Sequence, residues 1–159
     1  MNHWALNQVI GIAVAGGGVL VERNNVQGIA NVHTGTYGAY GIDIEFLNNC
    51  IVRNNFVSNI TQNMTTGNAF STINGVFGIR IAQGSGHQIY NNSVNLYGTL
   101  PGTDNSRLLS AALSINTSNS TGLDIRNNIL ANNLSGGTTL VSHVCVYLPG
   151  AATTGMGLT

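Results

Sequence analysis

The stretches Gly41-Ile42-Asp43-Ile44-Glu45 and Ile51-Val52-Arg53-Asn54-Asn55-Phe56-Val57 decide the fold of this chain. Apolar and acidic residues alternate in the first stretch, and a period of two is typical of a β-strand with one buried face. The second stretch places short apolar strands on both sides of an Asn-Asn pair. Asn tolerates the left-handed backbone of a sharp turn, and its side chain can bond the backbone. The segment therefore predicts three short strands with a tight Asn corner, and no helix.

The same unit recurs along the chain. The first residues of successive Asn pairs are 30, 37 and 36 positions apart, at Asn24-Asn25, Asn54-Asn55, Asn91-Asn92 and Asn127-Asn128. A strand that begins with a small residue precedes each pair, at 11–14, 41–44, 78–81 and 112–115. Length varies mainly after the pair, as it does in stacked coils whose loops differ. Stacking would align the Asn side chains as a ladder in which each amide bonds the next.

Two irregularities qualify this repeat. In the first unit Glu22 occupies a position that is apolar in the later units, where the residues are Val52, Ile89 and Ile125. Either the terminal coil is irregular or its register is shifted. A fifth unit starts at 145–148, and the chain stops before its Asn corner. This pattern predicts a segment of a longer solenoid or, alternatively, a subunit that stacks end to end.

Through these strand-Asn-Asn-strand units the chain resembles the right-handed parallel β-helix repeat family over nearly its whole length, and it is similar to large secreted bacterial β-helix surface proteins. The resemblance implies an all-β solenoid of about five coils that forms one domain over residues 1–159. It also implies an extracellular or cell-surface location.

The composition excludes several function classes. Five Arg and five acidic residues give a net charge of zero, and charged residues make up 6% of the chain. Without a basic cluster there is nothing to neutralise a row of phosphates, so nucleic acid is not an expected partner. The apolar stretch 9–21 is interrupted by glycines and is shorter than the roughly 20 residues of a transmembrane helix, so no membrane span is expected. No cofactor is expected either.

The outward positions of the first strand in each unit supply the candidate site. They read Ala13, Asp43, Arg80, Ser114 and Tyr147 from coil to coil. We interpret Asp43 and Arg80 as a cross-strand ion pair, worth about 1 kcal/mol or less if it is exposed. With Glu45 on the same face, the candidate surface binding residues are Asp43, Glu45, Arg80 and Tyr147. Two carboxylates on one strand without a third acid make a poor catalytic cluster, and no catalytic residue is assigned.

The histidines and cysteines suggest no metal site and no disulfide. His3, His33, His87 and His143 fall in different columns. His87 shares an inward column with Leu20, Cys50 and Leu123, so a buried, hydrogen-bonded histidine is expected there. Cys50 and Cys145 lie three coils apart. At about 4.8 Å per coil this separation exceeds disulfide reach, which predicts two free thiols.

These observations favour a non-enzymatic structural or adhesive segment of an extracellular protein that displays loops and contacts a polysaccharide or surface glycan. One alternative is part of a polysaccharide lyase or glycoside hydrolase, in which the four candidate residues would line a sugar groove. The other is a self-stacking fibre subunit. A groove with converging carboxylates would favour the enzyme.

The repeat alignment predicts that Ile79→Asp abolishes folding, because one unpaired ion in the core costs several kcal/mol. The conservative control Ile79→Val should lose only about 1 kcal/mol. Far-ultraviolet circular dichroism and chemical denaturation measure both effects. A soluble, β-rich Ile79→Asp protein would contradict the alignment.

Overall fold

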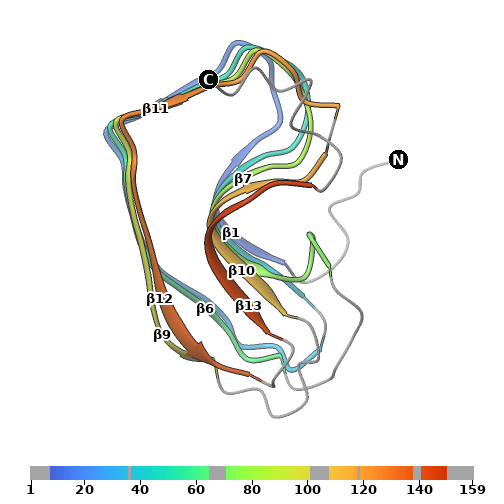
Figure 1. Ribbon diagram of the computed structural model, residues 1–159, viewed down its shortest axis with the longest axis vertical. Coiled ribbons are helices and arrows are strands. Elements are labelled where there is room, and N and C mark those ends of the chain that lie inside the picture. The colour runs from blue at the N-terminus through green and yellow to red at the C-terminus, as the bar shows by residue number, and fades with distance from the viewer. Residues whose placement is uncertain are drawn as a thin grey trace.

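The computed structural model describes residues 8–35, 37–64, 71–100, 108–117, 119–137 and 141–149, which contain thirteen β-strands and no helix. All strand pairs are parallel, and each strand pairs with the strand three positions before or after it in the chain. Figure 1 shows the coils stacked closely on one another. The chain runs counter-clockwise in this view while it advances toward the viewer, so the solenoid is right-handed.

Three parallel sheets form the sides of the solenoid. The first has five strands: β1 (Val9–Val14), β4 (Ala39–Ile44), β7 (Val76–Ile81), β10 (Leu109–Ile115) and β13 (Ser142–Tyr147). The second has four short strands: β2 (Leu20–Glu22), β5 (Ile51–Arg53), β8 (Gln88–Tyr90) and β11 (Asp124–Arg126). The third also has four: β3 (Asn25–Asn31), β6 (Phe56–Gln62), β9 (Ser93–Leu100) and β12 (Ile129–Gly136). Four coils are thus complete, and β13 begins a fifth, close to the predicted number.

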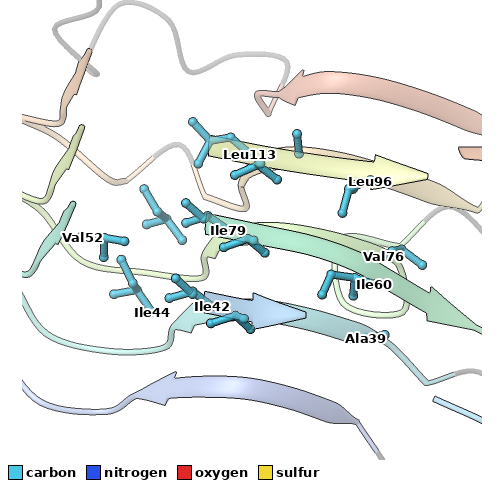
Figure 2. Packing of buried hydrophobic residues seen from close by; sticks show 14 of the residues in the cluster. Ala39, Ile42, Ile44, Val52, Ile60, Val76, Ile79, Leu96 and Leu113 are labelled. Atoms are coloured by element: carbon cyan, nitrogen blue, oxygen red, sulfur yellow. The ribbon is translucent and has the colours of Figure 1, made fainter. Parts of the chain in front are cut away.

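The core consists of aliphatic columns that run along the stack. Ile42, Ile79 and Leu113 lie in register on β4, β7 and β10 and are almost fully buried. Figure 2 shows these side chains on successive strands, with Val52 and Leu96 contributed by the other two sheets. Burying each such side chain contributes about 2 kcal/mol, so the repeated columns supply most of the driving force.

The small residue of each unit lies within the first strand, whereas the sequence placed it at the strand's start. β4 begins two residues before Gly41, and β7 begins two residues before Gly78. A Cβ on Gly41 would lie 2.4 Å from Cγ1 of Val57 on the opposite sheet and 2.6 Å from the Gly78 carbonyl oxygen. A small residue is required because these atoms of the opposite sheet and of the next coil come so close. The sheet that contains β1, β7 and β10 bends toward the interior of the solenoid, as Figure 1 shows.

The bend creates a second apolar column on the outer face of this sheet. Its members lie in register on the five strands of the sheet: Ile10, Tyr40, Phe77, Ala111 and Val144. Tyr40 and Phe77 have no exposed surface, and their ring centroids are 5.5 Å apart. The outer face of the first sheet is therefore a packed layer here and not a solvated surface.

The predicted Asn ladder forms, and it shows which residues make the corner of the first coil. Asn55 donates from Nδ2 to Oδ1 of Asn92 over 3.0 Å, and Asn92 donates in the same way to Asn128. In the first coil the ladder residue is Asn24, which bonds Oδ1 of Asn55. The left-handed residue before it is Arg23, with φ of 57°.

The corner of the first coil is thus Arg23-Asn24, and the predicted pair Asn24-Asn25 is wrong by one residue. Of the two explanations left open, the register shift is correct: Val21, and not Glu22, pairs with Val52. The same shift changes the inward column that contains Cys50. Leu20 pairs with Ile51, and Ile51 N–H donates to the Val19 carbonyl, so the residue aligned with Cys50 is Val19. Val19 therefore takes the place that the sequence assigned to Leu20.

Two adjacent substitutions test the ladder. Asn92→Ala removes an amide that bonds Asn55, Asn128 and the Val52 carbonyl, and it leaves several buried polar groups without partners. We expect a loss of about 3 kcal/mol or more in the free energy of unfolding. Asn91→Gly, at a left-handed φ of 55°, should change it by less than about 1 kcal/mol. Equal losses in urea denaturation would contradict the assignment of separate roles.

Candidate functional site

The structure places Asp43, Arg80 and Tyr147 on the outer face of the first sheet, and Glu45 directly after the end of β4. Asp43 pairs with Arg80, Arg80 with Ser114, and Ser114 with Tyr147, so the predicted column is correct. Side chains in register on adjacent parallel strands are neighbours, which brings Asp43 and Arg80 together. Tyr147, two coils beyond Arg80, instead packs against the apolar layer of Tyr40 and Phe77.

The predicted Asp43–Arg80 ion pair forms, and it is buried rather than exposed. Nη1 of Arg80 lies 2.8 Å and 2.7 Å from the two carboxylate oxygens of Asp43. The Asp43 side chain has no exposed surface, and the Arg80 side chain is 9% exposed. The guanidinium also lies against the ring of Tyr40, 4.7 Å from its centroid. Removing one partner of such a pair costs several times more than an exposed pair is worth.

Burial dominates the electrostatics of this cluster. It raises the pKa of Asp43 to about 6, since a charged carboxylate loses its hydration. Arg80 opposes this shift, whereas the half-buried Glu45 adds to it through its charge and a side-chain hydrogen bond. Burial also raises the pKa of Tyr40. At neutral pH the Asp43 carboxylate therefore remains ionised beside Arg80.

A pocket of about 440 Å³ opens beside Arg80, where β7 and β10 end. Its polar lining residues are Thr72, Arg80, Gln83, Asn116, Thr117 and Asn119. The volume lies within the roughly 300–1,000 Å³ range of small-molecule sites. Arg80 is the one charged residue among the described residues that line it, and Asp43 and Glu45 are not part of this lining.

Residues 71–75 cover the outer face of the sheet and form one wall of the pocket. Asn116 donates from Nδ2 to the Thr72 carbonyl over 2.6 Å, and its Oδ1 accepts from Ser114 over 2.8 Å. The Tyr40 hydroxyl donates to the Ile73 carbonyl. Asn116 was visible in the sequence as the residue aligned with Glu45. The sequence could not predict that the loop residue Thr72 lines the pocket, because loops lack the periodic pattern by which strands are aligned.

The three histidines in the described residues, His33, His87 and His143, form hydrogen bonds. His87 is fully buried, as predicted: its Nδ1 accepts from Cys50 N–H, and its Nε2 lies 3.1 Å from the Gln83 carbonyl oxygen. Burial lowers the pKa of His87. His33 lies in an exposed turn, 4.7 Å between ring centroids from Tyr37, and His3 lies outside the described residues. No group of three or more His, Cys, Asp or Glu side chains that could hold a metal occurs within the described ranges.

The side chains of Ser110 and His143 are in hydrogen-bonding contact, which the sequence did not predict. Ser110 Oγ lies 2.6 Å from Nδ1 of His143, and Asn132 donates to the same hydroxyl over 2.9 Å. Ser110 has no exposed surface, so its hydroxyl cannot reach a substrate. We interpret this trio as a buried polar network that links β10, β12 and β13.

Both cysteines are free thiols, as predicted. Cys50 is buried and bonds the Gly16 carbonyl, whereas Cys145 is exposed on β13. Cys145 aligns with Ala112 in the register of β10 and β13, as the repeat predicted. The two thiols contribute nothing to the pocket, since neither is among its lining residues.

The fold defines the chain as a parallel β-helix protein. Comparison with known proteins adds nothing to this class, because no family model, no curated protein and no solved structure matches the sequence. The likeness to secreted bacterial surface proteins therefore stays a prediction. Within the described part of the chain, no helix is long and apolar enough to cross a membrane.

The buried carboxylate predicts a specific pH dependence of stability. Asp43 has a pKa of about 6 when folded and 3.8 in the reference state, so between these values the folded protein holds a proton that the unfolded chain has lost. Stability from this group is present below pH 4 and falls as the pH rises through 6, by up to about 3 kcal/mol.

Asp43→Asn removes this contribution while it keeps an oxygen that can accept from Arg80. Urea denaturation of both proteins between pH 4 and 7 measures the difference in their free energies of unfolding. The comparison also cancels the opposite contribution of His87, whose lowered pKa makes stability rise with pH. A constant difference across this range would contradict the burial argument.

Proposed function

We propose that this chain is a non-enzymatic, glycan-binding segment of an extracellular or cell-surface protein, in which a rigid β-helix presents the polar pocket to a sugar. The observation that carries the proposal is the chemistry of the pocket wall. Most small-molecule pockets are lined mainly by apolar groups, whereas this wall is rich in amide and hydroxyl side chains. Such groups donate and accept hydrogen bonds at once, which is what a sugar's hydroxyl groups require.

The position of the pocket supports the same proposal. It lies at the ends of β7 and β10, whose residues are all buried, so its walls are attached to a fully packed part of the solenoid. Asn116 and Tyr40 hold the loop wall against the sheet. A preformed pocket loses little conformational entropy when a ligand binds.

The enzyme alternative receives less support from the same geometry. A catalytic carboxyl must reach within hydrogen-bonding distance of the substrate. Asp43 is fully buried and bonded to Arg80, and Glu45 does not line the pocket. Stacking into a fibre stays a prediction from the sequence.

Sugar titrations monitored by amide nuclear magnetic resonance test the proposal. The probes are glucose, galactose and their uronic acids, and the expected response is a shift of the Gly84 and Thr117 amide signals at millimolar sugar. Gln83→Ala and Asn119→Ala remove exposed amide side chains of the pocket and should weaken binding several-fold. Their matched controls, Gln27→Ala on β3 and Asn133→Ala on β12, remove exposed amides elsewhere and should leave binding unchanged.

The two outcomes are easily separated. Sugar-dependent shifts that the pocket variants reduce and the controls retain support the proposal. The absence of shifts with all four sugars, or shifts that map to β3 and β12, would rule out this pocket as a glycan site.

A further inference from the structure

Arg80 has hydrogen-bonding capacity that its ion pair does not use. Both bonds to Asp43 come from Nη1. Nε is buried and has no acceptor among the described residues. A buried donor without a partner costs about 1–3 kcal/mol and needs an explanation in a native structure. Arg80 also lines the pocket, so an acceptor carried by a ligand could reach this side chain.

The unused part of the guanidinium has a defined chemical preference. Nε and Nη2 form the side-on edge of the group, which binds a carboxylate through two parallel hydrogen bonds. Asp43 occupies the opposite end through Nη1, and the Tyr40 ring lies against the guanidinium. The group is thus held in one orientation before any ligand arrives, which lowers the entropic cost of binding.

We propose that the pocket binds an acidic sugar, whose carboxylate binds the guanidinium of Arg80 while the amide and hydroxyl side chains of the wall bind the sugar hydroxyls. This inference rests on the proposed glycan-binding function and narrows it to sugars that carry a carboxylate. Arg80 supplies the discrimination, because a neutral sugar carries no negative charge to pair with the guanidinium.

The charges around Arg80 predict an effect of Asp43→Asn on ligand affinity that a purely structural ion pair would not give. Asp43 from β4 offsets the charge of Arg80, and Glu45, directly after the end of β4, lies close to Asp43. Asp43→Asn removes the competing negative charge and keeps a hydrogen-bond acceptor for Nη1. The ligand carboxylate should then bind several-fold more tightly. If the pair only supported the fold, the same substitution would weaken binding or leave it unchanged.

The experiment compares matched sugars at neutral pH by the same resonance titration. Glucuronate is paired with glucose and galacturonate with galactose, so that each pair differs in the carboxylate; acetate serves as the carboxylate without a sugar. The proteins are wild type, Asp43→Asn, the double variant Asp43→Asn/Arg80→Gln and the control Asn133→Ala. The double variant replaces both charges with amides, so it leaves no unpaired buried ion, and thermal melting checks its fold.

The wild-type protein is expected to bind at least one uronate about tenfold or more tightly than its neutral partner. Asp43→Asn should strengthen that binding, the double variant should lose the uronate preference, and Asn133→Ala should match wild type. Asp43→Asn leaves Arg80 without its carboxylate partner, so thermal melting checks the fold of this variant too. If either variant does not fold, the sugar pairs on the wild-type protein decide.

The failures of the two proposals differ. Equal binding of neutral and acidic sugars at the pocket would overturn the role of Arg80 and keep the glycan site. Acetate that binds as tightly as the uronates, with neutral sugars inactive, would show a carboxylate site that ignores the sugar and would overturn the acidic-sugar proposal. No binding by any probe would overturn both.

Discussion

The amide ladder at the corner between the second and third sheets is the interaction on which the rest of the structure depends. Each ladder Asn uses its backbone N–H and its side chain to hold the next coil, through bonds such as those from Asn55 to Asn92. These bonds fix the register of the coils. A slip of one residue would turn every strand side chain to the opposite face, so the ladder also decides that Ile79 faces the core and Arg80 faces outward.

Because register is set at the corner, the loops between units can differ in length without disturbing the stack. The long connection between β6 and β7 uses this freedom, since residues 71–75 lie over the outer face of the first sheet and are tied down through Tyr40 and Asn116. The outward column is thereby changed from a surface stripe into a buried layer. The same cover encloses the Asp43–Arg80 pair and supplies a wall of the pocket.

The sequence predicted what repeats and missed what does not. Period-two alternation and the recurring Asn pairs sufficed for the three sheets, the columns and the Asp43–Arg80 pairing, because each follows from register alone. The corner of the first coil was misplaced because Arg23 takes the left-handed position that Asn takes elsewhere, and a search for Asn pairs selects Asn24-Asn25 instead. The burial of the ion pair and the pocket wall depend on a loop, whose residues carry no periodic signal.

The Asp43–Arg80 pair is hard to explain as a stabilising element. A buried ion pair often contributes less than apolar side chains of similar size, and here it leaves Arg80 Nε without an acceptor among the described residues. The neighbouring column shows what the fold uses where stability alone matters, since Tyr40 and Phe77 stack in the same layer. The feature that the pair adds is a fixed cation at a polar pocket. The presence of the pair at this position therefore agrees better with the proposed binding of an anionic group than with a role in the stability of the solenoid.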